Sequence, residues 1–132
     1  MNYDDSFGLA ACDVSDMSDL ARKSNPDMNV PTPSMERMPD YLGRPVAGAV
    51  GPWPWSKPVV NSKVYGGKLT PEQRVDLYDT IVHEAWHYDK QDFYNRNSAK
   101  SEREATSEAA NRTLKLRDEI LKGGAGSCGG KK

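Results

Sequence analysis

The sequence feature that most constrains this chain is an H-E-x-x-H motif, formed by His83, Glu84 and His87 in a stretch that reads as a helix. Residues four apart on a helix share one face, with Cβ atoms roughly 5–6 Å apart. Two imidazoles placed in this way can bind one Zn²⁺ and leave room for a third ligand and a water molecule. The carboxylate of Glu84 then lies beside that water and not on the metal, so it can act as a general base. The motif therefore predicts a zinc site with a hydrolytic base next to it.

The motif is a specific signal because histidine is scarce in this chain. The 132 residues include two histidines, and both belong to the motif. The stretch resembles the zincin metallopeptidases, in which an apolar run leads into H-E-x-x-H on a buried helix, as Ile81-Val82 does here. The alternative is that both histidines are ordinary polar residues of an amphipathic helix.

Length and charge limit what else the chain can be. With 132 residues it can form one domain with a modest core. Its formal net charge of −1 indicates neither a nucleic-acid partner nor an anionic membrane. No apolar run approaches the roughly 20 residues that a membrane-spanning helix needs. The acidic start of the chain lacks the basic-then-apolar order of a signal peptide, so export by the general secretory route is not predicted.

Proline separates an irregular part of the chain from a helical part. Eight of the nine prolines lie within residues 25–58, where they favour extended, irregular chain. Before them, only Val14–Leu20 favours a short turn of helix. We therefore predict an irregular leader or linker over residues 1–40, a zincin-like metallopeptidase core over 41–122 and a flexible Gly/Lys tail over 123–132.

One short β element is predicted in the core. Residues 58–65 read as a strand or a tight hairpin, closed by Gly66-Gly67. In zincins a strand upstream of the metal helix forms an edge of the cleft, and an extended substrate adds to it as a further strand. The resemblance implies the same role for this strand.

Two helices are predicted to follow the strand. The first begins after Thr70, which can form a capping box with Gln73, and is expected to reach about Tyr94. The second begins after Ser98 or Ser101 and ends at the glycine pair before the tail. The predicted fold class is therefore mostly α with a small β element (α+β). Its minimal core is two antiparallel helices plus a short strand or hairpin, behind an irregular proline-rich N-terminal segment.

Two histidines hold zinc poorly, so a third protein ligand is needed. Since no third histidine is present, an acidic side chain must supply it, and the candidates are Asp89, Asp92, Glu102, Glu104 and Glu108. If the two helices are antiparallel and turn near residue 95, the histidine pair lies about 15 Å from the turn and level with residue 105. Glu104 is then level with the metal, and Glu108 lies roughly 6 Å further along. We favour Glu104, with Glu108 and Glu102 as alternatives because the register at a turn varies by a few residues.

The sequence Arg103–Glu108 resembles the N-E-A-x-S-D pattern of the glutamate-zincin (gluzincin) metallopeptidases. In that family the first acid binds zinc, and the acid four residues later orients a ligand histidine. The resemblance implies that Glu104 is the zinc ligand and that Glu108 is hydrogen-bonded to His83. It also implies a zinc metallopeptidase in which Glu84 takes a proton from the activated water and returns it to the leaving amine.

Hydrolysis of a peptide bond also needs a hydrogen-bond donor, besides zinc, for the developing oxyanion. Because the chain has no spare histidine, a tyrosine is the natural choice. Tyr94 follows the predicted metal helix and is our candidate. Tyr65, next to the predicted strand, is the alternative.

The wider organisation of the chain resembles the C-terminal toxin domain of bacterial polymorphic toxins, such as Rhs or type VI effectors. The shared features are a short H-E-x-x-H domain, a proline-rich front end, no signal peptide and a Gly/Lys-rich end. The resemblance implies delivery within a larger protein by a specialised secretion system, a protein or peptide substrate and a cognate immunity protein as partner. Two other functions stay open: a metal amidase that cleaves peptidoglycan cross-links, and a non-catalytic interaction domain with a structural metal or none.

Overall fold

The computed structural model describes residues 2–51, 55–91 and 98–123, with residues 2–11 described through their backbone only. In these ranges the chain is mostly helical with a small three-stranded sheet, which confirms the predicted α+β class. The elements follow in the order α1 (Asn2–Ser24), β1 (Ser34–Glu36), β2 (Gly48–Val50), β3 (Pro58–Asn61), α2 (Ser62–Tyr65), α3 (Pro71–Lys90) and α4 (Ala99–Leu121). None of the helices in the described part is both long and apolar enough to cross a bilayer.

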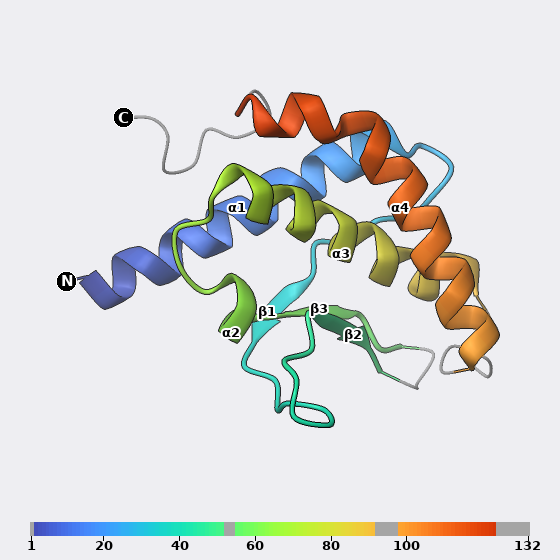
Figure 1. The fold of residues 1–132 in the computed structure, drawn as a ribbon, viewed down its shortest axis with the longest axis horizontal. Coiled ribbons are helices and arrows are strands. Elements are labelled where there is room, and N and C mark those ends of the chain that lie inside the picture. The colour runs from blue at the N-terminus through green and yellow to red at the C-terminus, as the bar shows by residue number, and fades with distance from the viewer. Residues whose placement is uncertain (1, 52–54, 92–97, 124–132) are drawn as a thin grey trace.

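Helix α3 lies at the centre of the fold and packs against both other long helices and two of the strands (Figure 1). Helices α1 and α4 and strands β2 and β3 all contact it. Its start is as predicted, because the Thr70 hydroxyl accepts a hydrogen bond from the Gln73 backbone N–H at 3.1 Å while the Gln73 side chain accepts from the Thr70 N–H at 2.8 Å. Its buried side chains cover more than one face: Leu77, Tyr78, Thr80, Ile81, Val82, Glu84, Ala85 and His87. A helix covered on several sides holds its motif residues in fixed directions.

The start of the chain differs from the irregular leader predicted over residues 1–40. Helix α1 lies there, and Val14, Met17 and Ala21 are buried in the core that it forms with α3. Their spacing of three and four residues places them on one helical face. Because the residues before Val14 carry few periodic apolar positions, the sequence predicts only a short turn there. Packing of this narrow stripe against α3 accounts for the helix from Val14 to Ala21.

The sheet has the strand order β1-β3-β2, with β1 parallel and β2 antiparallel to β3. The strand predicted from residue 58 is therefore present as β3, but it is the central strand and cannot form the edge of a cleft. Strand β2 is the edge strand that also contacts α3. The predicted hairpin is absent here because the Asn61 side chain accepts the Lys63 N–H at 3.0 Å, which ends β3 and starts α2.

Helix α4 begins and ends where the sequence predicts. The Ser98 hydroxyl accepts the Ser101 N–H at 3.1 Å at its start, and Gly123 follows its end with φ of 77°. The buried residues along its length are mostly small: Ser101, Ala105, Ala109, Thr113 and Ile120. Small side chains let α4 approach α3 closely, which brings the first turn of α4 to the histidines. The tail predicted beyond Gly123 lies outside the described residues.

Candidate metal centre

Helix α3 places His83 and His87 one turn apart on the side that meets the start of α4. His87 is 5% exposed and His83 is partly buried. The two rings stand edge to face with their centroids 4.9 Å apart, and their Nε2 atoms are 3.2 Å apart. Both imidazoles therefore present the same nitrogen to one point in space.

The third group at this point is Glu102, in the first turn of α4. Its Oε2 lies 3.2 Å from Nε2 of His83, and its Oε1 lies 3.0 Å from Nε2 of His87. The Glu102 side chain is 61% exposed, so its carboxylate reaches the histidines from the solvent side. The positive end of the α4 dipole favours a negative charge in this turn.

The spacing of these three groups fits a tetrahedral metal ion. A ligand nitrogen lies about 2.0–2.1 Å from Zn²⁺, so two ligands on a tetrahedron are about 3.3 Å apart. The distances of 3.0 and 3.2 Å between the Nε2 atoms and the carboxylate oxygens are close to this value. Imidazole and carboxylate lone pairs repel at such distances unless a proton or a cation lies between them. Ligand atoms of His83, Glu84 and His87 also lie within 4.8 Å of one another, so the chain has a group that can hold a metal ion.

Glu84 is buried beside this group, and only 7% of its surface is exposed. Burial, with the neighbouring Glu102 carboxylate as a second cause, raises the pKa of Glu84 to about 8. Strand β2 packs directly on this side chain, since a Cβ on Gly48 would lie 3.3 Å from Cγ of Glu84. A carboxyl group held in this environment can exchange a proton near neutral pH.

A cavity of about 730 Å³ opens beside Glu84 and His87. Strand β2 forms one wall, the start of α4 a second and the segment Met38–Tyr41 a third. Buried Asn61 holds this third wall, because its Oδ1 accepts the Met38 N–H at 3.0 Å and its Nδ2 donates to the Val46 carbonyl at 2.6 Å. The candidate metal centre therefore lies at the side of a cavity that runs along an edge strand.

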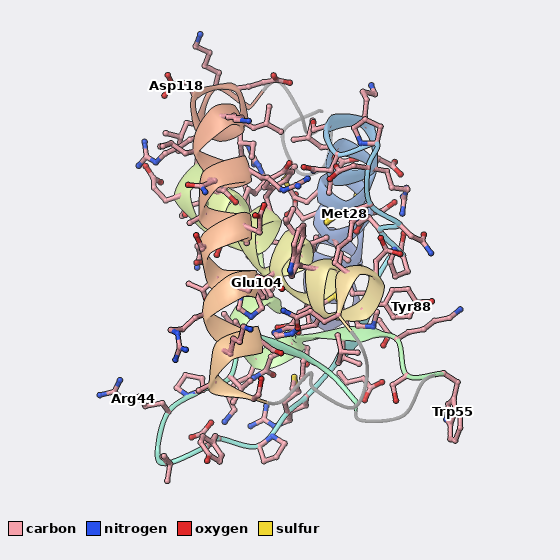
Figure 2. The ribbon with its side chains drawn as sticks, turned by 90° about the vertical axis from the view of Figure 1, so that its right-hand side faces the viewer. Met28, Arg44, Trp55, Tyr88, Glu104 and Asp118 are labelled. Atoms are coloured by element: carbon pink, nitrogen blue, oxygen red, sulfur yellow. The ribbon has the colours of Figure 1, made fainter. Side chains whose placement is uncertain are left out.

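The structure places Glu104, the ligand favoured from the sequence, outside this group. Its Oε1 accepts hydrogen bonds from the Trp86 indole N–H at 3.0 Å and from the Gln91 amide at 2.9 Å. The hydrogen bond from Gln91, and to a smaller extent that from Trp86, lowers the pKa of Glu104. Figure 2 shows Glu104 on the side of α4 turned toward α3. The carboxylate that reaches the histidines is Glu102, which the sequence left as an alternative.

Glu108 differs from its expected place as well, and rotation around α4 explains both differences. The sequence predicts that Glu108 accepts from His83, but its Oε1 accepts from Nε of Arg112 at 3.3 Å. Successive helical residues turn by about 100°, so the side chains of Glu102 and Glu104 leave α4 about 200° apart. Height along the helix axis alone therefore does not determine which carboxylate reaches the histidines. Glu102 points to the cavity, whereas Glu104 and Glu108 lie on the side of Arg112.

The predicted oxyanion donor, Tyr94, lies outside the described residues. Its alternative, Tyr65, is buried away from the cavity and is 1% exposed. The Tyr65 hydroxyl donates to Oδ2 of Asp76 at 2.7 Å and is hydrogen-bonded to Oγ1 of Thr80 at 2.8 Å, so it holds α2 against α3. Among the described tyrosines, Tyr41 lines the large cavity.

Gln91 is the residue near the centre that the sequence analysis missed. Its Oε1 lies 2.6 Å from Nδ1 of His87, four residues before it in the chain. The spacing of four residues is a signal that could have indicated this contact. A glutamine at a helix end is, however, usually exposed to solvent, so the pattern alone carries little weight.

Comparisons with known proteins identify no relative of this chain. No protein-family model, no curated protein and no solved structure matches it. The function is therefore inferred from the geometry of the candidate metal centre and its cavity.

Proposed function

We propose that the chain is a zinc-dependent peptidase that hydrolyses peptide bonds with Glu84 as the general base. The observation that carries this proposal is the convergence of His83, His87 and Glu102 within 3.2 Å, beside buried Glu84. Structural zinc sites have four protein ligands, whereas catalytic sites have three and keep a position open for water or substrate. Two histidines and one glutamate form a ligand set of the catalytic kind.

Each residue of the centre has a distinct task in this reaction. A bound Zn²⁺ supplies Lewis acidity, which lowers the pKa of a water molecule to about 7 and polarises the peptide carbonyl. His83, His87 and Glu102 hold and orient the ion. Glu84 accepts the proton from the water and delivers it to the leaving amine.

An extended polypeptide is the substrate that the cavity favours. Strand β2 lines the cavity and is an edge strand of the sheet. Extended chains add to edge strands through backbone hydrogen bonds, which do not depend on the side chains of the added segment. We therefore propose unfolded or extended segments of proteins as the substrate class.

The variant Glu84→Gln tests the proposal, because glutamine has the size of glutamate but cannot take up the proton. We expect it to retain one zinc ion per chain and to lose at least ~100-fold in the rate of cleavage of denatured casein. Glu119→Gln, at an exposed position near the far end of α4, is the matched control and should retain both zinc and activity. Near wild-type cleavage by Glu84→Gln, or a wild-type protein that binds no zinc, would refute the proposal.

A further inference from the structure

We infer that Gln91 is a positioning residue that fixes the tautomer and orientation of His87, and that Ser101 and Glu104 hold Gln91 in place. This inference rests on the proposed function in taking His87 as a metal ligand. It adds residues that make no contact with the metal position itself.

The hydrogen bonds of Gln91 determine which way its amide points. Its Nε2 donates to the backbone carbonyl of Ser101 and to the carboxylate of Glu104, at 2.9 Å in each case. A carbonyl and a carboxylate can only accept, so the amide nitrogen must face both of them. The opposite orientation would place the amide oxygen against two other oxygens. Oε1 of Gln91 therefore faces His87, 2.6 Å from its Nδ1.

This orientation determines where His87 carries its proton. Because an amide oxygen can only accept, Nδ1 of His87 must be the donor. In a neutral imidazole only one nitrogen carries hydrogen, so Nε2 of His87 retains its lone pair. Nε2 is the nitrogen that lies 3.2 Å from His83 and 3.0 Å from Glu102. The contact with Gln91 therefore directs a free lone pair to the metal position.

Glu104 is fixed from a second direction, which gives Gln91 a firm partner. The Trp86 indole N–H donates to the same Glu104 oxygen at 3.0 Å. The guanidinium of Arg112 lies 5.3 Å from the centre of the Trp86 ring. These contacts join Trp86 of α3, and Gln91 just after α3, to Glu104 and Arg112 of α4. In this arrangement Glu104 acts on the metal centre through Gln91 and not as a ligand.

Zinc affinity of Gln91 variants provides the first test. Gln91→Leu removes the acceptor of the His87 Nδ1–H and is expected to weaken zinc binding by about 10–100-fold, the usual effect of losing a partner of a ligand histidine. Glu119→Gln, at an exposed position near the far end of α4, is the control, because it takes no part in the contacts around Gln91 and His87. We expect its zinc affinity to stay within a few-fold of the wild type. Competitive titration against a fluorescent chelator measures both.

Nuclear magnetic resonance of the zinc-loaded protein reads the proton directly and does not depend on activity. The His87 Nδ1–H should give a slowly exchanging signal in the wild type that is lost in Gln91→Leu. His83 provides an internal reference, since the chain contains only these two histidines. The double variant Gln91→Glu with Glu104→Gln should keep the signal, because a carboxylate at position 91 also accepts from Nδ1–H and the amide at position 104 can donate to it.

Exchanging the amide and the carboxylate between positions 91 and 104 tests whether Gln91 acts by orienting His87 or only by stabilising the fold. Gln91→Glu places a carboxylate against Glu104, and adding Glu104→Gln restores a donor between the two positions. The double variant should therefore bind zinc more tightly than Gln91→Glu alone, and equal affinities would overturn the inference even if Gln91→Leu failed to fold. Wild-type affinity with an unchanged Nδ1–H signal in Gln91→Leu would overturn it while leaving the metal centre intact. Absence of zinc from the wild type would refute the metal centre and the inference together.

Discussion

Gly48 in strand β2 permits a close contact between the sheet and α3, and its replacement by alanine tests this packing. A Cβ at this position would lie 2.9 Å from Cγ2 of Thr80, 2.9 Å from the carbonyl oxygen of Val59 and 3.3 Å from Cγ of Glu84. The Val59 carbonyl belongs to the backbone of β3 and cannot rotate away. Strand β2 must therefore shift relative to both β3 and α3 in Gly48→Ala. Overpacking of this kind costs about 1–3 kcal/mol of unfolding free energy.

Thermal unfolding measures this cost. For a chain of this length a loss of about 1–3 kcal/mol lowers Tm by roughly 3–15 °C. Gly67→Ala is the matched control, because no atom lies within 4 Å of a Cβ at that position, and its Tm should not fall. Adding Thr80→Ser to Gly48→Ala removes Cγ2 but keeps the hydroxyl that bonds to Tyr65, so part of the loss should be recovered. Unfolding of Gly48→Ala at the wild-type temperature would refute the close packing of β2 on α3.

Two further variants test the core and the contact between the helices. Burial raises the pKa of Asp13 above its ordinary value of 3.8, and the opposing effect of the nearby Arg74 is smaller. Because the folded state then binds the Asp13 proton more tightly than the unfolded state does, the wild type loses stability as the pH rises above 3.8. Asp13→Asn should therefore stabilise the protein in urea unfolding at pH 7 but not at pH 3, and an equal difference at both pH values would contradict this. Ala105 is 0% exposed between α3 and α4, so Ala105→Leu should cost about 1–3 kcal/mol and also weaken zinc binding by moving Glu102. Ala110→Leu, at an exposed position of α4, should do neither in the same thermal and zinc titrations.

The parts of the structure that could be predicted are those that depend on neighbours in the sequence. The capping box of Thr70 and Gln73 and the cap at Ser98 are local contacts, and both helix starts were therefore correct. The pairing of His83 with His87 follows from their spacing on one helix. These contacts need no knowledge of how the elements pack.

The parts that could not be predicted depend on how distant segments meet. Helix α1 is stabilised by a narrow apolar stripe that includes Met17. This stripe stabilises a helix only when it packs against the surface of α3, which the sequence of α1 alone does not reveal. The position of β3 in the middle of the sheet depends on β1 and β2, whose short sequences carry little strand signal. The choice between Glu102 and Glu104 depends on the rotation of α4 about its axis, which its contact with α3 determines.

The identity of the third zinc ligand can be determined by one measurement. Competitive zinc titration of the wild type, Glu102→Ala and Glu104→Ala compares the residue at the histidines with the residue that holds Gln91. We predict one tight zinc site in the wild type, loss of tight binding in Glu102→Ala, and a loss of no more than about 10–100-fold in Glu104→Ala. Tighter zinc binding by Glu102→Ala than by Glu104→Ala would contradict the assignment of Glu102 as the ligand.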